Sequence, residues 1–278
     1  LMVSSQATGI AEAAYREALK YAQERAQFGK VINQFAPVFE ILTDMKVKIA
    51  ALRTLYYETS RFVDVYKTLE EIEHERELTP EEKTELKQFK RRADFYTPLI
   101  KGLSSEASNR ITYDAIQIHG GTGFTKDFPV ERLYRDARIT SIYEGTTQLQ
   151  VIAAIKGVTS GLFSEMMDEY ASRKISYDIE FMLKELKAMK KEYLSAIEYV
   201  ESFKDQEYLD FHARRLVEMA GNIIMGHLLL LDADRDQRFR LSAEVFIKKA
   251  KAENTDRMLV IKEIEPDFLN NYKELTKL

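Results

Sequence analysis

The sequence predicts an all-α protein: an antiparallel helical bundle followed by a second, smaller helical bundle. Apolar residues recur at the three- and four-residue spacing of amphipathic helices, and no segment alternates with the period of two that is typical of a strand. Glycine and proline are also scarce, at 11 and 5 of 278 residues. A strand-rich fold needs more turn residues than that, so helices are favoured.

The first expected helix covers residues 5 to about 26, with alanines spaced so that a neighbouring helix can approach closely. A second helix should begin near Pro37, a residue suited to the first helical turn. A third should run from Pro80 to about residue 118, where Pro98 can bend it. The seam of the second helix consists of Val38, Leu42, Met45, Ile49, Leu52 and Tyr56.

A charged stretch separates the second and third helices. Between residues 67 and 92, 15 of 26 residues are charged, which is typical of a solvated helical hairpin. Within it, Thr79 can cap a helix that has Pro80 at its first position. We therefore expect a long charged hairpin at residues 64–93.

Glycines interrupt the helical pattern twice after the third helix. The first break contains Gly120, Gly121 and Gly123, and the second lies at residues 143–145. A short helix should start near residue 128. Another, capped by Thr146 or Thr147, should turn Leu149, Ile152, Ala153 and Ile155 inward.

We place a domain boundary near Gly161. The predicted domains are residues 1–160, which include the charged hairpin, and residues 161–278, with helices at about 176–204, 206–233 and 240–262. The apolar stretch 216–231 contains Glu, Asn and His and is short for a bilayer, so it predicts a buried core helix and no transmembrane segment.

The composition narrows the possible chemistry. With 45% hydrophobic residues the chain can form a core, which excludes general disorder. The absence of cysteine excludes disulfides, thiolate metal sites and thiol nucleophiles. A net charge of −4 gives no basic footprint for nucleic acid. Because the first residues do not look like a signal peptide and no cysteine is present, we expect a cytoplasmic protein.

The two glycine loops are the candidate site. Gly120 and Gly121 permit the backbone to approach a large ligand, and the start of the next helix offers free N–H groups to anions. Glu144 stands just before that helix. From residue types alone, a capping role for Glu144 is more frequent than a catalytic one. The four histidines are scattered without metal-ligand spacing, so we expect no metal site.

Several segments resemble the acyl-CoA dehydrogenase family. The runs QIHGGTGF (117–124), FPVERLYRDAR (128–138) and IYEGTTQLQ (142–150) are similar to the family signature. RAQFGK (25–30) resembles the family's flavin-contacting segment at a comparable distance upstream. The resemblance covers residues 1 to about 160, and the remainder is similar to the added helical domain of larger members.

The resemblance implies the carboxy-terminal part of an FAD-dependent enzyme of fatty acid β-oxidation that converts acyl-CoA to trans-2-enoyl-CoA. Glu144 would be the general base that takes the α-proton, while hydride passes from the β-carbon to the flavin. The thioester carbonyl would be polarised by the backbone N–H of Glu144 and a ribityl hydroxyl. Tyr143 and Gly145 would line the substrate site.

By the same resemblance, two sets of residues contact FAD, and electron-transfer flavoprotein is the expected electron acceptor. Thr146 and Gln148 match contacts to the flavin whose substrate Glu144 attacks. A second set matches contacts to the flavin of a neighbouring subunit, so a homodimer or homotetramer is expected. This second set is Arg25, Gln27, Phe28, Gln117, Gly120 and Gly121.

Two alternatives stay open at this stage. An acyl-CoA oxidase has similar chemistry but is reoxidised by oxygen, and a non-catalytic helical assembly module could retain the family fold. The family's amino-terminal helical domain and middle β-domain have no counterpart in the sequence. We therefore expect that this chain alone binds FAD weakly and is inactive.

Overall fold

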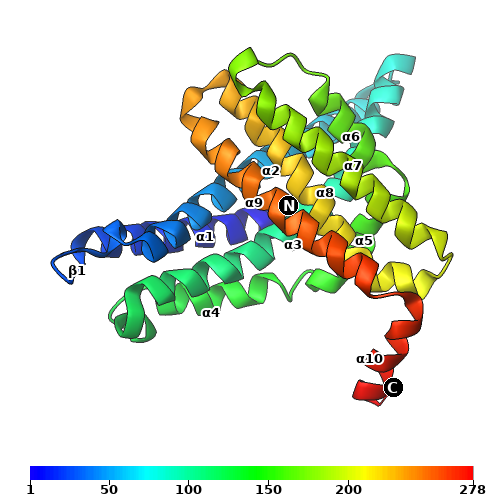
Figure 1. Ribbon diagram of the computed structural model, residues 1–278. Coiled ribbons are helices and arrows are strands. Elements are labelled where there is room, and N and C mark those ends of the chain that lie inside the picture. The colour runs from blue at the N-terminus through cyan, green and yellow to red at the C-terminus, as the bar shows by residue number, and fades with distance from the viewer. Residues whose placement is uncertain (278) are drawn as a thin grey trace. The chain divides into compact units, whose positions relative to one another are not determined.

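The computed structural model describes residues 1–277 as a chain of α-helices with a single two-stranded hairpin in that range (Figure 1). The all-α prediction is confirmed. The chain divides into two compact units, Leu1–Gln150 and Val151–Leu278. The predicted boundary near Gly161 stays a prediction.

The first unit is a bundle of long helices. The strands are only two residues long, too short for a periodic pattern to be visible in the sequence. Helix α5 leads from this unit into the second. The elements are α1 (Met2–Glu24), β1 (Ala26–Gln27), β2 (Lys30–Val31), α2 (Ala36–Glu75), α3 (Pro80–His119), α4 (Val130–Thr140) and α5 (Thr147–Thr159).

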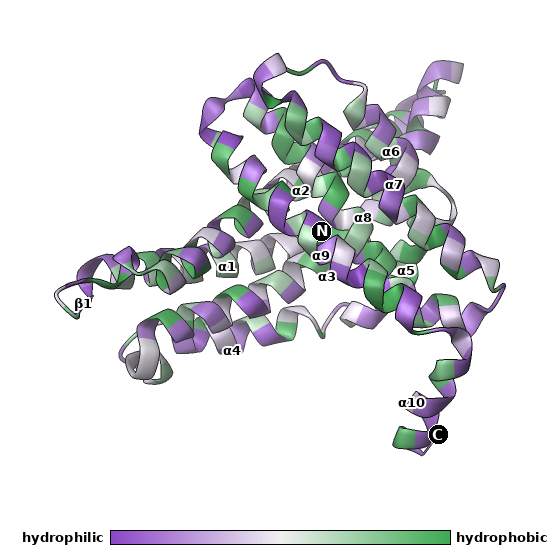
Figure 2. Cartoon of the chain, in the orientation of Figure 1, coloured by the Kyte–Doolittle hydropathy of each residue, from purple (hydrophilic) through white to green (hydrophobic). Residues whose placement is uncertain are grey.

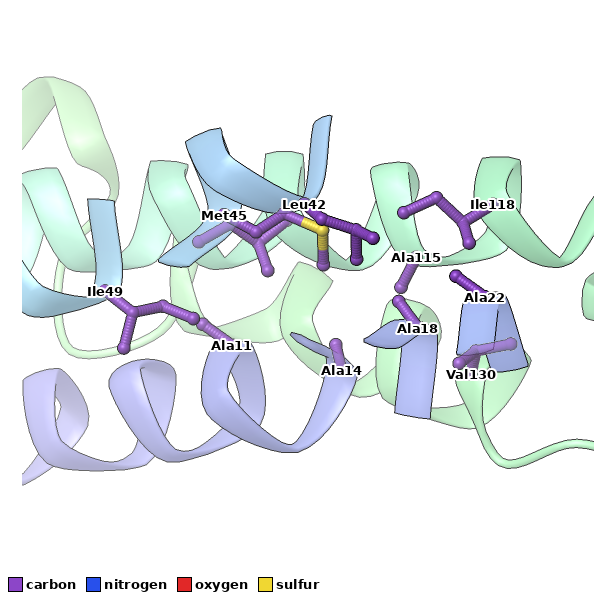
Figure 3. Close-up of a cluster of buried hydrophobic side chains, with 11 residues drawn as sticks. Ala11, Ala14, Ala18, Ala22, Leu42, Met45, Ile49, Ala115, Ile118 and Val130 are labelled. Atoms are coloured by element: carbon purple, nitrogen blue, oxygen red, sulfur yellow. The ribbon is translucent and has the colours of Figure 1, made fainter. Parts of the chain in front are cut away.

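The core of the first unit lies where α1 packs against α2 and α3 (Figure 3). The stripe of small residues on α1 is completely buried, so its backbone approaches the neighbouring helices closely. Leu42, Met45 and Ile49 of α2 fill the facing surface, as the predicted seam requires. The buried stripe on α1 comprises Ala7, Ala11, Ala14, Ala18 and Ala22.

Helices α2 and α3 form a long antiparallel pair of 40 residues each. Pro98 lies inside α3, which continues past it without interruption. A proline removes the hydrogen bond to the carbonyl four residues earlier, here that of Asp94.

The start of α3 is fixed by a capping box. The Glu82 amide donates to Thr79 Oγ1 at 3.2 Å, and the Thr79 amide donates to the Glu82 carboxylate at 2.9 Å. Arg76 also binds this carboxylate through two nitrogens, at 2.8 and 2.6 Å. The hydrogen bonds from Arg76 and from the Thr79 amide hold the pKa of Glu82 at about 2.

Replacing Thr79 by Ala is expected to destabilise the first turn of α3 by about 1 kcal/mol, because the Glu82 amide loses its acceptor. Hydrogen exchange at amides 82–84 measures the effect, and Thr84→Ala, whose hydroxyl bonds a helix carbonyl, is the control. The contribution of ionised Glu82 should be complete above its ordinary pKa of 4.5 and disappear only as the pH falls toward 2. Unchanged exchange in Thr79→Ala would contradict the capping role.

The second unit packs around α8. Among the described residues one helix, α8, is long and apolar enough to cross a membrane. Of its most apolar stretch, 89% is buried within the protein, as expected for a core helix. On α7 the apolar seam from Met182 to Val200 is buried. The elements are α6 (Leu162–Ala171), α7 (Glu180–Ser202), α8 (Gln206–Arg235), α9 (Arg240–Glu263) and α10 (Leu269–Thr276). Figure 2 shows hydrophobic and hydrophilic residues interspersed along the helices.

The predicted inward face of α5 is wrong in part. Leu149 and Ile152 are 56% and 57% exposed, and Ala153 is exposed too. Ile155 is buried as expected, together with Ala154 and Val158. At the start of this helix the buried Thr147 hydroxyl binds the Glu106 carboxylate of α3.

Candidate active site

Glu144 lies in the short loop between α4 and α5, and its side chain is exposed. Its backbone is left-handed, with φ of +54°, and Gly145 follows with φ of +90°. A left-handed conformation costs a residue with a Cβ roughly 1–2 kcal/mol. Strain of this kind persists only where neighbouring groups hold it, and it is frequent at functional sites.

Three side chains hold this loop. The Lys101 ammonium of α3 donates to the Gly145 carbonyl at 2.5 Å. The Gln150 amide donates to the Glu144 carbonyl at 3.1 Å and to the Gly145 carbonyl at 3.3 Å. On the other side, the Tyr143 hydroxyl donates to Gln6 of α1.

The start of α5 is tied to α3 as well. Thr147 Oγ1 donates to the Glu106 carboxylate at 2.6 Å, and the Thr147 amide donates to the Ser141 carbonyl at 3.1 Å.

The Lys101 side chain, which binds the loop from α3, is only 4% exposed. Burial lowers the pKa of Lys101, while the carboxylates of Glu106 and Glu144 act in the opposite direction. The base candidate therefore lies beside a buried cation.

The second candidate segment, residues 25–30, forms the hairpin after α1. Gln27 pairs with Lys30, so Phe28 and Gly29 are the two loop residues. Both have positive φ, 50° and 81°, as a type I′ turn requires. Phe28 is 91% exposed at the tip of this turn. The hairpin therefore exposes the Phe28 ring to solvent at a turn whose flanking residues are paired.

The glycine loop after α3 is a 3₁₀ turn, Gly120–Phe124. A Cβ added at Gly120 or Gly121 would meet no atom within 4 Å, so the backbone is open there to a ligand. A Cβ at Gly123 would lie 2.9 Å from the Ile116 carbonyl oxygen, so Gly123 is required by packing.

His119 connects the glycine loop to the end of α1. Its ring stacks on Tyr21 with centroids 4.3 Å apart, and Thr122 Oγ1 donates to the Tyr21 hydroxyl at 3.4 Å. Burial lowers the pKa of His119, which favours the neutral ring. Arg25 follows Tyr21 by one helical turn, so the hairpin and the glycine loop lie at the same end of the bundle (Figure 1).

The predicted site residues thus form two clusters. Gln117 follows Lys101 by sixteen positions of one continuous helix, so the clusters lie about 24 Å apart along α3. The first, at the hairpin end, contains Arg25, Gln27, Phe28, Gln117, Gly120 and Gly121, all exposed. The second contains Tyr143, Glu144, Gly145, Thr146 and Gln148.

The first cluster is compatible with FAD. The first offers an arginine, two amide side chains, an exposed aromatic ring and a glycine backbone without obstruction. Guanidinium and backbone N–H groups suit phosphates, and an aromatic ring suits a flat ring system. Within residues 1–277 no group of three or more His, Asp or Glu side chains is placed to hold a metal ion.

The sequence alone did not indicate Lys101, Glu106 or Gln150 as site residues. One signal was available, because Lys101 lies directly after Ile100 on the apolar side of α3, where a charged residue is unusual. Gln150 stands at the end of the quoted motif, but its role becomes visible only when the loop folds back onto it.

Comparison with known proteins finds a family match for each of two parts of the chain. Residues 1–159 match the family described as "Acyl-CoA dehydrogenase, C-terminal domain", and residues 159–269 match "Acyl-CoA dehydrogenase C terminal". A crystal structure of acyl-CoA dehydrogenase complexed with FAD from Bacillus anthracis has a similar fold, with a TM-score of 0.71 and 22% identity. The similarity covers 93% of this chain and 47% of that one.

Two of the curated relatives each match about half of this chain. The caffeyl-CoA reductase-Etf complex subunit CarC of Acetobacterium woodii is 39% identical over 150 residues, and the short-chain specific acyl-CoA dehydrogenase of Megasphaera elsdenii is 37% identical over 150 residues. Each match covers 54% of this chain and 33% of the relative. The chain therefore spans about a third of the length of these relatives.

Proposed function

This chain belongs to the acyl-CoA dehydrogenase family, and we propose that it is the carboxy-terminal part of an FAD-dependent enzyme that oxidises acyl-CoA to trans-2-enoyl-CoA. The observation that supports this most directly is Glu144, an exposed carboxylate in the family's Tyr-Glu-Gly-Thr motif. Its backbone is held in a strained conformation by hydrogen bonds to its loop. A general base needs such a fixed position.

Glu144 would accept the α-proton of the acyl-CoA directly on its carboxylate. Its own backbone N–H would donate to the thioester carbonyl and stabilise the negative charge that develops as the proton leaves. FAD, when bound, supplies the acceptor for the hydride from the β-carbon. Tyr143 and Gly145 would border the substrate, since they flank the base in the same loop.

The two clusters support contacts to two different flavins. Thr146 and Gln148, next to the base, would contact the flavin that serves the same active site. The hairpin cluster lies about 24 Å away along α3, so it would contact the flavin of a second subunit. That second set is Arg25, Gln27, Phe28, Gln117, Gly120 and Gly121. A homodimer or homotetramer follows from this assignment.

The electron acceptor we propose is electron-transfer flavoprotein, and the compartment is the cytoplasm. One relative is named as a subunit of a complex with Etf, which supports an acceptor of this kind. The lack of cysteine in the chain agrees with a reducing compartment.

The test is a panel of acyl-CoA thioesters mixed with the full-length protein under anaerobic conditions. Bleaching of the flavin absorbance by at least one thioester is expected, with electrons passing to electron-transfer flavoprotein. Rapid peroxide formation with oxygen as the sole acceptor would instead indicate an acyl-CoA oxidase. A protein that binds flavin but is bleached by none of the thioesters would favour a non-catalytic assembly module.

The isolated chain should bind FAD weakly and show no dehydrogenase activity. Its flavin-contacting groups are exposed, and it covers only about a third of the length of its relatives. Gel filtration after incubation with FAD measures the retained flavin. Stoichiometric yellow flavin in the protein peak would contradict this prediction.

A further inference from the structure

One face of α3 binds the segment from the end of α4 to the start of α5. Asn109 donates to the Ala137 carbonyl at 3.1 Å, and Ser105 donates to the Thr140 carbonyl at 2.9 Å. These two bonds fix the last turn of α4. Glu106 accepts from Thr147 at the start of α5, as described above.

Lys101 is the last member of this row, one helical turn before Ser105. Its ammonium nitrogen lies 2.5 Å from the Gly145 carbonyl oxygen, and its side chain is 4% exposed. A buried ammonium group without partners would be strongly unfavourable. Its hydrogen bond to Gly145 and its attraction to the carboxylates of Glu106 and Glu144 offset that cost.

The carbonyl that Lys101 binds belongs to the strained part of the loop. Glu144 and Gly145 both have positive φ, and their two carbonyls accept hydrogen bonds from the side chains of Lys101 and Gln150. Gln150 is half-buried on the short helix α5, whereas Lys101 is buried on the long helix α3. Lys101 is therefore the more rigid of the two anchors.

We propose that Lys101 is a positioning residue for Glu144: its ammonium group, acting through the Gly145 carbonyl, holds the left-handed backbone that presents the carboxylate to the substrate. This inference rests on the proposed function for its catalytic consequence. Lys101 takes no part in the proton transfer itself. Its effect should therefore be on the rate of the chemical step and little on substrate affinity.

The test compares Lys101→Met, Lys101→Arg and Lys87→Met in the full-length enzyme loaded with FAD. Lys87 is an exposed lysine on the same helix and serves as the matched control. Lys101→Met should lower kcat about 10-fold or more while KM changes less than about 3-fold, because the base is displaced. Lys101→Arg, which retains a cationic donor, should recover part of the loss, and Lys87→Met should behave as wild type. A kcat for Lys101→Met within about twofold of wild type would overturn the proposal.

A second measurement does not depend on catalysis. Hydrogen exchange at amides 143–148 of this chain should be about 10-fold faster in Lys101→Met, because the loop loses a charge-assisted bond, while the α1–α2 core exchanges as before. Unchanged exchange in this loop would overturn the role of Lys101 even if no acyl-CoA bleaches the wild-type enzyme. Absence of bleaching with faster exchange would reject only the proposed function. If Lys101→Met does not fold, Lys101→Gln, which removes the charge and shortens the side chain, takes its place in both comparisons.

Discussion

Replacing Glu144 by Gln in the full-length enzyme is expected to leave flavin binding intact and to abolish the bleaching of the flavin by acyl-CoA. Gln has nearly the same shape but cannot accept the α-proton. A positioned general base typically contributes 10²- to 10⁴-fold, so the bleaching rate should fall at least about 100-fold. Stopped-flow absorbance under anaerobic conditions measures this rate.

The control is Glu85→Gln, an exposed carboxylate on α3 far along the chain from the loop. It should bleach at the wild-type rate. The left-handed backbone at residue 144 is retained in Glu144→Gln, because the bonds from Lys101 and Gln150 go to main-chain carbonyls and not to the carboxylate. Rapid bleaching in Glu144→Gln would show that another group removes the proton.

The helical seams were predictable because they repeat many times. Leu42, Met45 and Ile49 recur with the helical period, and each is buried in the core of the first unit. The inward face of α5 was mispredicted because this helix is short and its apolar residues nearly surround it. Its first turn is bound to α3 by the hydrogen bond between Thr147 and Glu106, 41 residues apart, and no local pattern contains such a contact.

The motifs identified which residues form the candidate site but not their geometry. Nothing in the sequence indicates that Glu144 or Phe28 has a left-handed backbone, because neither residue type favours positive φ. Phe28 adopts it where the two-residue turn requires it, and Glu144 where Lys101 and Gln150 hold the loop. Both conformations depend on contacts that form only in the folded chain.

Substitution of two glycines in the glycine loop is expected to have the second large effect. Gly123→Ala should lower the stability of the fold, whereas Gly121→Ala should lower the affinity for flavin. Gly123→Ala places a methyl group 2.7 Å from His119 Cβ and 2.9 Å from the Ile116 carbonyl oxygen. The backbone of α3 cannot yield easily, so we expect the free energy of unfolding of the chain to fall by about 1–3 kcal/mol. Chemical denaturation followed by circular dichroism measures this loss. An unchanged unfolding transition would contradict the packing role of Gly123.

Gly121→Ala adds the same methyl group where no atom lies within 4 Å and where φ is not positive. The stability of the isolated chain should therefore change by less than about 0.5 kcal/mol. In the full-length enzyme, however, that methyl group would occupy the space proposed for the flavin, and FAD should bind about tenfold more weakly or worse. Fluorescence titration of the apoenzyme with FAD measures the affinity. Loss of stability in Gly123→Ala together with loss of flavin affinity in Gly121→Ala would show that the fold requires Gly123 and the ligand requires Gly121. Wild-type affinity in Gly121→Ala would contradict the proposed contact between the flavin and this loop.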